Sequence, residues 1–441
     1  MRLAILGGGG FRVPLVHRTL VDDARRGVPG RCDELVLYDT DPGRLRVISA
    51  ILDEQAAAVP DAPVVRIASD LDDAVRGADF VFSAIRVGGT AGRVRDERIP
   101  LGEGVLGQET VGAGGVLYGL RTIPVAVHIA ERVAALAPEA WVINFTNPAG
   151  MVTEAMSAVL GDRVIGICDS PVGLVRRAAL AVGADPDEVE YDYVGLNHLG
   201  WLRSLTLDGR ELLPGLLADE QALGTLEEGR LFGAWWLRTL GALPNEYLHY
   251  YYFRRETLAA TRAAAETRGE FLAQQQGRFF EEAAGAPPGR VRELWERARL
   301  HREETYLADG RAASGGWERD TCDLEGGGYD QVALALMRAV SGDAGVRLIL
   351  NVRNGGTVPA LDADAVIETV CEVSAKGAAP LSCAPVRPDQ LGLMLQLKAV
   401  ERGTIDAALH GNRSAAVRAL ALHPLVDSPA VARRILEQAG Y

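Results

Sequence analysis

The sequence predicts an α/β protein, in which an N-terminal, Rossmann-like doubly wound parallel sheet is followed by a C-terminal mixed α+β domain. Before Tyr193, short apolar runs alternate with helix-compatible segments, as they do in parallel sheets. After Tyr193 the helical segments become longer and more charged, and strand-like runs become sparser. The clearest of these later elements are a helix over residues 257–284 and a strand over 346–352. We therefore expect two domains, over residues 1–192 and 193–441.

The chain begins with a predicted strand, a glycine turn and a helix. Residues 3–6 are apolar, glycines occupy positions 7–10, and apolar residues then recur at roughly helical spacing over 13–20. Such a turn lets backbone N–H groups approach a pyrophosphate at a helix N-terminus. Arg12 stands where the third glycine of the usual pattern is expected. The predicted cofactor-binding residues of this turn are Gly7, Gly9, Gly10, Phe11 and Arg12.

A second strand is predicted over residues 34–39, and it ends in Asp39. A carboxylate at this position can accept hydrogen bonds from an adenosine ribose and would repel a 2′-phosphate. The sequence therefore favours NAD over NADP as the cofactor. The alternative is that Asp39 is an ordinary turn residue at the end of a strand.

The predicted sheet continues with further strands separated by helices. The strand-like runs span residues 79–85, 140–144 and 163–167, and the helical segments span 45–58, 71–75 and 120–137. Ligands of doubly wound sheets bind beyond the C-terminal ends of the strands. Arg86, Asn147 and Cys168 each follow such a strand, so we expect one crevice to collect them.

Composition narrows the class of ligand and the compartment. The net charge is −13, from 46 Lys and Arg against 59 Asp and Glu, and no long basic run is present. This balance argues against nucleic acid or an anionic membrane as a partner and favours a small molecule. No apolar run reaches the roughly 18 residues of a membrane-spanning helix. The cysteines are five in number and form no CxxC pair, which is typical of reduced thiols in the cytoplasm.

Cys168 and His198 form a candidate metal site beside the predicted cofactor site. Two protein ligands are too few for structural zinc, so the other coordination positions would be open to water or to substrate oxygens. A metal held in this way acts as a Lewis acid on a bound hydroxyl or carbonyl group. The alternative is that Cys168 is a buried apolar residue and His198 a structural one.

Aromatic residues cluster over positions 244–253. Most of these rings are expected to pack against one another. A tyrosine next to a metal cation would have a lowered pKa, and it could then act as a base.

At this point the chain resembles glycoside hydrolase family 4, the NAD- and metal-dependent glycosidases. The resemblance rests on motifs in a fixed order along most of the chain. They are GGGGFRVP at 7–14, RVGG at 86–89, GQET at 107–110, NFTNPAG at 144–150, CDSP at 168–171, Asn197-His198, YLHYYY at 247–252 and NGGTVP at 354–359.

The resemblance implies a redox-neutral elimination mechanism. In this family NAD⁺ oxidises the sugar at C3, and a divalent metal, usually Mn²⁺, is held by the residues matching Cys168 and His198 and by substrate hydroxyls. A tyrosine removes the C2 proton, the leaving group departs from C1, water adds, and NADH reduces C3 again. Tyr247 is the expected base, with Tyr250 as the alternative. Family members are usually homodimers or homotetramers.

The resemblance also implies roles for residues around the substrate. Asn147 is expected to orient substrate hydroxyls, Glu109 to hold a metal-bound water, and Asp169 and Asn197 to contact the substrate. Many family members act on 6-phosphorylated sugars. Such a phosphate could be bound by three arginines, which are Arg86, Arg93 and Arg95.

The substrate class remains divided between several alternatives. Asp169 after the cysteine is typical of phospho-α-glucosidases, whereas the tyrosine cluster is typical of the β-type. We expect a 6-phospho-β-glucosidase, with a 6-phospho-α-glucosidase or a glycosidase of unphosphorylated sugars as alternatives. A second possibility is an NAD-dependent 2-hydroxy acid dehydrogenase of the lactate/malate type, in which Cys168 would be inert. A third is a nucleotide-sensing protein without catalytic activity.

Overall fold

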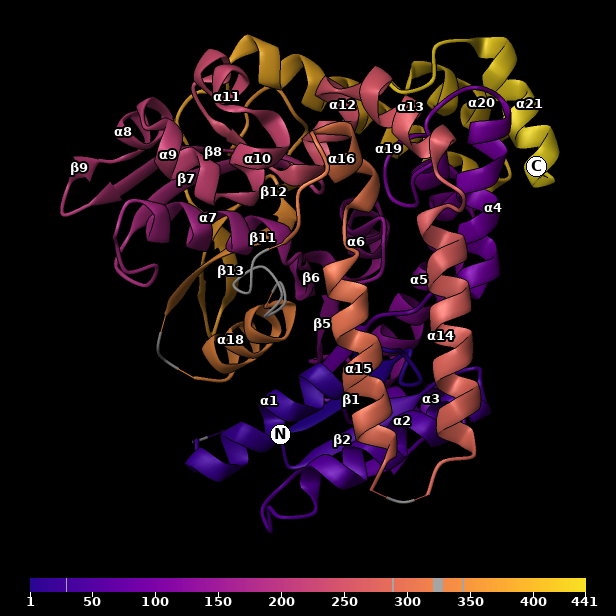
Figure 1. The fold of residues 1–441 in the computed structure, drawn as a ribbon. Coiled ribbons are helices and arrows are strands. Elements are labelled where there is room, and N and C mark those ends of the chain that lie inside the picture. The colour runs from indigo at the N-terminus through magenta and orange to yellow at the C-terminus, as the bar shows by residue number, and fades with distance from the viewer. Residues whose placement is uncertain (29, 288, 320–327, 343–344) are drawn as a thin grey trace.

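Six parallel strands form the N-terminal part of the sheet in the computed structural model, which describes residues 1–28, 30–287, 289–319, 328–342 and 345–441 (Figure 1). Their order is β3-β2-β1-β4-β5-β6, the order of a dinucleotide-binding fold. The strands are β1 (Arg2–Leu6), β2 (Glu34–Tyr38), β3 (Val64–Ile67), β4 (Phe80–Ser83), β5 (Trp141–Asn144) and β6 (Val164–Gly166). The predicted Rossmann-like doubly wound sheet is confirmed.

Helices cover both faces of this parallel region. They are α1 (Val13–Arg26), α2 (Pro42–Ala56), α3 (Leu71–Val75), α4 (Gly89–Gly102), α5 (Gly112–Leu136) and α6 (Ala149–Leu160), and the 3₁₀ turn η1 (Gly161–Arg163) follows. The sequence missed α4 and the first eight residues of α5, because glycines at both N-termini resemble turns. In α5 these glycines allow close packing, since a Cβ at Gly114 would lie 2.0 Å from the Gln108 carbonyl oxygen.

The sequence predicted that no segment is long and apolar enough to cross a membrane, and one helix contradicts this prediction. Among the described residues, α5 meets that criterion by its length and composition. However, 72% of its most apolar 18-residue window is buried inside the protein, as in the central helix of a domain.

The C-terminal half extends the same sheet with antiparallel strands. Strand β11 (Val346–Arg353) pairs with β6, and the order then continues as β12-β7-β8-β10. The other strands are β7 (Glu190–Leu196), β8 (Leu199–Leu207), β9 (Arg210–Glu211), β10 (Leu243–Pro244), β12 (Val366–Ser374) and β13 (Gly377–Pro380). The strands after Tyr193 are therefore more numerous than predicted, because glycines and charged residues interrupt their apolar patterns.

Two long helices of the C-terminal half pack against α2 of the N-terminal region. Figure 1 shows α14 (Arg268–Ala284) and α15 (Val291–Glu304) as two long neighbouring helices beside the N-terminal domain. The predicted continuous helix over residues 257–284 is wrong: it is divided into α13 (Arg254–Ala263) and α14. Thr267 ends the interruption by capping α14 in a capping box with Glu270.

The remaining helices complete the cover of the sheet. They are α7 (Ser170–Ala181), α8 (Leu213–Ala218), α9 (Glu220–Thr225), α10 (Glu227–Phe232), α11 (Ala234–Leu240), η2 (Glu246–Leu248), α12 (His249–Tyr252), α16 (Ala308–Ala313), α18 (Tyr329–Ser341), α19 (Pro388–His410), α20 (Arg413–Leu422) and α21 (Pro429–Ala439). Cys322 lies outside the described residues, and the other four cysteines are free thiols.

Candidate active site

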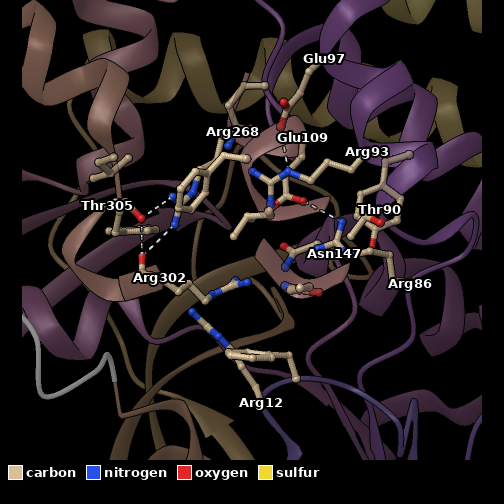
Figure 2. Close-up of a pocket in the computed structure, with 18 of the residues that line it drawn as sticks. Arg12, Arg86, Thr90, Arg93, Glu97, Glu109, Asn147, Arg268, Arg302 and Thr305 are labelled. Carbon is tan, nitrogen blue, oxygen red and sulfur yellow. Dashed lines mark hydrogen bonds and ion pairs between the residues drawn. The ribbon is translucent and has the colours of Figure 1, made fainter. Parts of the chain in front are cut away.

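A cavity of about 470 Å³ lies beyond the carboxyl ends of β1, β4, β5 and β6, where the fold predicts a ligand (Figure 2). Segments from both halves of the chain line it. Most of the predicted site residues lie on its wall: Gly7, Gly10, Phe11, Arg12, Arg86, Arg93, Glu109, Asn147, Cys168, Asp169, Asn197, His198, Tyr247 and Tyr250. The fold thus brings these residues together from distant parts of the sequence.

The glycine turn has a backbone that side chains would obstruct. Gly7 has a positive φ of 87°, and a Cβ there would lie 2.5 Å from the Ala84 carbonyl oxygen. Asp39 does not line the cavity; its carboxylate accepts a hydrogen bond of 2.9 Å from the N–H of Gly9. Glycine at position 7 is thus required where the turn packs against the segment after β4. The pyrophosphate role of the turn and the ribose role of Asp39 stay predictions.

The two residues after the glycines are held by helices of the C-terminal half. The indole of Trp295 donates a hydrogen bond to the Phe11 carbonyl oxygen (2.8 Å). The Tyr329 hydroxyl donates a hydrogen bond to the Arg12 carbonyl oxygen (2.6 Å). The Arg12 guanidinium extends toward Asp169, at 3.4 Å from its carboxylate. Arg12 thus connects the glycine turn to the segment that contains Cys168.

Cys168 and His198 lie on the wall of the same cavity. Cys168 follows β6 and is 4% exposed; burial raises the pKa of its thiol well above the usual value, and the charges of Glu368 and Asp169 act in the same direction. His198 lies in the two-residue turn between β7 and β8, with a φ of 62°. Burial lowers the pKa of His198 to about 3, so its imidazole is neutral at physiological pH.

Two atoms on this wall are buried donors or acceptors without a protein partner. They are His198 Nδ1 and Asn147 Oδ1, for which no hydrogen-bonding atom is present in the described part of the chain. With the Cys168 sulfur they supply nitrogen, oxygen and sulfur ligands to one cavity, which suits a divalent cation that keeps open positions. The described residues contain no group of three or more His, Cys, Asp and Glu side chains suited to a metal.

The two candidate tyrosines occupy different positions. The ring of Tyr247 stacks on that of His198, with centroids 3.7 Å apart and planes 7° apart. Burial raises the pKa of Tyr247 above its usual value, and the Tyr306 hydroxyl donates a hydrogen bond of 3.3 Å to its oxygen. The Tyr250 hydroxyl instead faces the carboxylate of Asp309, at 3.4 Å. Tyr247 is therefore the tyrosine in contact with the metal-ligand candidate.

Arg86 and Arg93 bind the same carboxylate. Glu109 accepts a hydrogen bond from Arg86 at 2.7 Å and forms an ion pair with Arg93 at 2.8 Å (Figure 2), and Arg93 also pairs with Glu97. Although burial opposes it, these two arginines lower the pKa of Glu109 to about 2. Glu109 is thus a carboxylate anion between the Arg86 and Arg93 guanidinium groups. Its contact with a metal-bound water stays a prediction.

Arg95 is not brought to this cavity. Its guanidinium donates a hydrogen bond of 3.1 Å to the carbonyl oxygen of Ala439, at the end of α21. The side chain points away because Arg93 and Arg95 are two positions apart on the helix α4, and residues at this spacing do not share a face.

Three cavity arginines were missed by the sequence analysis: Arg44, Arg268 and Arg302. Arg268 begins α14 and Arg302 lies near the end of α15. Burial lowers the pKa of Arg302 to about 9, and the charges of Arg12 and Arg268 lower it further. Burial and Arg93 likewise lower the pKa of Arg268 to about 10. The capping-box pattern from Thr267 to Glu270 could have placed Arg268 at a helix start, whereas no local pattern indicates Arg302.

Arg12, Arg268 and Arg302 line one part of the cavity, and their positive charges favour an anionic ligand there. Figure 2 shows the guanidinium groups of Arg12 and Arg302 directed toward the same part of the cavity. Arg268 donates to the hydroxyl of Thr305 (2.7 Å) and to the backbone carbonyl of Arg302 (2.9 Å), both uncharged acceptors. For Arg268 and Arg302, the described residues provide no carboxylate within salt-bridge distance.

A buried carboxyl group behind the cavity was also missed. Glu246 directly precedes Tyr247, and it accepts a hydrogen bond from Ser170 (2.6 Å). The Tyr306 hydroxyl lies 3.3 Å from both the Glu246 carboxylate and the Tyr247 oxygen, so its single proton is donated to one of them at a time. Burial raises its pKa to about 7, and the charge of Glu228 adds to this effect. The only local signal for Glu246 was its position next to the predicted base.

Known proteins match this chain along most of its length. A 6-phospho-beta-glucosidase of Escherichia coli is 32% identical, over 97% of this chain and 92% of the relative. A 6-phospho-alpha-glucosidase of Lacticaseibacillus paracasei is 30% identical, over 98% of this chain and 95% of the relative. Among solved structures, the 6-phospho-beta-glucosidase of Thermotoga maritima with manganese, NAD⁺ and glucose-6-phosphate has a TM-score of 0.83 at 27% identity, covering 100% of this chain and 97% of that one.

The family models agree with these relatives. The model of the family 4 glycosyl hydrolases matches residues 2–183, and the model of the C-terminal domain of the same family matches residues 193–426. These matches confirm the resemblance drawn from the motifs, and they favour a glycosidase over a hydroxy acid dehydrogenase. The chain belongs to family 4 of the glycosyl hydrolases.

Proposed function

We propose that this protein hydrolyses 6-phospho-β-glucosides with NAD⁺ and a divalent cation such as Mn²⁺. The observation that carries the proposal is the pair of unpartnered ligand atoms of His198 and Asn147, which line one cavity with the Cys168 sulfur and the glycine turn. A 6-phospho-α-glucosidase is the second candidate, because a relative of that name is nearly as similar and Asp169 follows the cysteine.

The residues present fit both implied groups. Gly7 and Gly10, which line the cavity, would lie next to the pyrophosphate of NAD⁺, whereas Gly9, also predicted for this role, is directed toward Asp39 and Leu45. Cys168 and His198 would hold the cation while leaving positions for substrate oxygens. When bound, NAD⁺ would supply reversible oxidation at sugar C3, and the cation would stabilise the negative charge that develops beside the C2 proton.

The chain's own residues would then orient the sugar and move one proton. Asn147 Oδ1 is free to accept a hydrogen bond from a substrate hydroxyl, and Asn197 lies across the same cavity. Tyr247 would take the C2 proton onto its phenolic oxygen. The hydroxyl of Tyr306 donates to that oxygen and would stabilise the phenolate form.

The phosphate would be bound by the arginine cluster. Arg268 and Arg302 are cations without a carboxylate partner in the described structure, and their pKa values are lowered first by burial and then by the positive charges of neighbouring arginines. A phosphate dianion would relieve the repulsion among these charges and accept charge-assisted hydrogen bonds. Arg86 and Arg93, which the sequence predicted for this role, also line the cavity but are already paired with Glu109.

We expect Arg302→Gln to lower kcat/KM for a 6-phosphorylated substrate by about tenfold to a hundredfold, since a hydrogen bond to a charged group contributes about 1.5–3 kcal/mol. Turnover of the unphosphorylated glucoside should change little. Arg299→Gln, which removes an arginine paired with Glu296 on the same helix, is the control. Equal losses for both substrates would show that Arg302 does not recognise the phosphate.

The proposed activity is tested with p-nitrophenyl α- and β-glucosides, with and without a 6-phosphate, in the presence of NAD⁺, Mn²⁺ and a thiol reductant. We expect release of p-nitrophenol from the phosphorylated β-glucoside without net accumulation of NADH. Turnover confined to the α-anomer would replace the β-assignment by the second candidate. NADH formation in proportion to product would contradict a glycosidase.

We further propose that residues 1–192 form the NAD-binding domain and residues 193–441 the domain that completes the substrate and metal sites. We propose a cytoplasmic location, which agrees with the free thiols of Cys32, Cys168, Cys371 and Cys383. A homodimer or homotetramer is proposed from the resemblance to the family.

A further inference from the structure

A row of residues in register crosses the sheet from β6 to β8. Each residue of the row pairs with the next one on the neighbouring strand, from β6 through β11, β12 and β7 to β8. In strand order the row consists of Gly166, Asn351, Glu368, Gly195 and Gly200. Cys168 follows the first strand of this row, and His198 lies in the turn between the last two. The row therefore connects the two segments that carry the metal-ligand candidates.

Glu368 is the central residue of this row, and it is fully buried. Its Oε1 accepts hydrogen bonds from the side-chain amides of Asn351 (3.0 Å) and Asn197 (3.2 Å). Its Oε2 accepts one from the Tyr193 hydroxyl (2.9 Å). One carboxylate thus satisfies three buried donors, and one of these donors belongs to the residue next to His198.

The glycines of the row make room for this polar cluster. A Cβ at Gly200 would lie 2.2 Å from the Tyr193 hydroxyl oxygen, and a Cβ at Gly166 would lie 2.8 Å from the Cβ of Asn351. Outside the row, a Cβ at Gly150 would lie 3.2 Å from the Cβ of Asn197. Larger residues at these positions would displace the side chains that bind Glu368.

We propose that Glu368 is a positioning residue, which holds the Asn197–His198 turn at a fixed place relative to Cys168. This inference rests on the proposed metal site. His198 has a left-handed backbone conformation, which non-glycine residues adopt only where their surroundings enforce it. The hydrogen bond from Asn197 to Glu368 supplies such a restraint. It also occupies the Asn197 amide nitrogen and leaves the amide oxygen for a ligand in the cavity.

Two substitutions distinguish the hydrogen-bonding role of Glu368 from an effect of its negative charge. In Glu368→Gln, the amide oxygen can accept from both asparagines, and the amide nitrogen can donate to the Tyr193 oxygen, so the network survives without the charge. In Glu368→Met, the volume is retained but three buried donors lose their acceptor.

The test measures Mn²⁺ affinity of the full-length, NAD⁺-saturated protein, by the electron paramagnetic resonance signal of free Mn²⁺. We expect Glu368→Gln to stay within about threefold of the natural protein, and Glu368→Met to bind Mn²⁺ about 10- to 100-fold more weakly, as is usual when support of a metal ligand is lost. NAD⁺ affinity should be unchanged in both. Asn351→Leu, which removes one donor to Glu368, provides a milder variant with an expected loss of about fivefold.

The control is Glu154→Met, which removes another buried carboxylate that pairs with Lys398 (2.7 Å) and Arg402 (2.8 Å). It should lower Tm without changing Mn²⁺ affinity. If Glu368→Met and Asn351→Leu bind Mn²⁺ like the natural protein, or if Glu368→Gln is as weak as Glu368→Met, the positioning role is overturned. If the natural protein itself binds no Mn²⁺ with NAD⁺ present, the proposed metal site fails instead.

Discussion

Cys168→Ser is expected to lower Mn²⁺-dependent turnover by about a thousandfold or more. The thiolate is one of two protein ligands proposed for the cation, and a cation stabilises transition-state charge by several kcal/mol, where each 1.36 kcal/mol is a factor of ten in rate. A serine hydroxyl is a much poorer anionic ligand than a thiol. The measurement is kcat with the phosphorylated substrate over a range of Mn²⁺ concentrations.

NAD⁺ affinity distinguishes loss of the metal from loss of the fold in this variant. It should stay near normal, because the glycine turn lies at β1 and Cys168 follows β6. Cys32→Ser is the matched control, since Cys32 is also buried but does not line the cavity. If Cys168→Ser keeps its Mn²⁺-dependent activity, Cys168 is not a metal ligand.

Tyr247→Phe is expected to lower kcat by about 10²- to 10⁴-fold, the usual contribution of a positioned general base. The phenyl ring can still stack on His198, so Mn²⁺ and NAD⁺ affinities should change little. Because C3 oxidation precedes loss of the C2 proton, the variant should accumulate NADH in a single turnover, measured by absorbance at 340 nm. The natural protein should show no such accumulation.

Tyr250→Phe is the matched variant within the same aromatic cluster. Its hydroxyl faces Asp309, not His198, so we expect a loss of less than about tenfold, in the range of one ordinary hydrogen bond. The opposite order, with Tyr250→Phe inactive and Tyr247→Phe active, would assign the base to Tyr250.

The N-terminal half of the fold could be predicted because its signals are local. The runs that become β1, β2, β4, β5 and β6 each contain consecutive apolar residues that are buried, as in strands covered on both faces. Strand β3 was missed since it lies at the edge of the sheet, where Val64 is 68% exposed. Strands β7 and β8 were missed because Gly195, which lies against the backbone of β8, and Gly200, which makes room for Tyr193, interrupt their apolar pattern.

The site was predicted where residues follow strands or belong to a recognisable motif, and it was missed where neither signal is present. Cys168 and Asn147 follow strands of one parallel sheet, so topology alone places them at one crevice. Arg302 and Glu368 carry no such signal: the first lies on a charged helix, and the second is an acid within an apolar strand. Their positions depend on how α15 and β12 pack against elements more than a hundred residues away.

The sequence by itself determined the parallel sheet, the glycine turn and the presence of a thiol and an imidazole among polar turn residues, because these follow from apolar periodicity and residue type. Only the tertiary structure decided which charges remain available to a ligand. Arg93 is neutralised by Glu97 and Glu109, whereas Arg302 faces other arginines and has no carboxylate partner among the described residues. Ion pairing depends on distances of a few ångström across separate elements, and sequence spacing does not specify those distances.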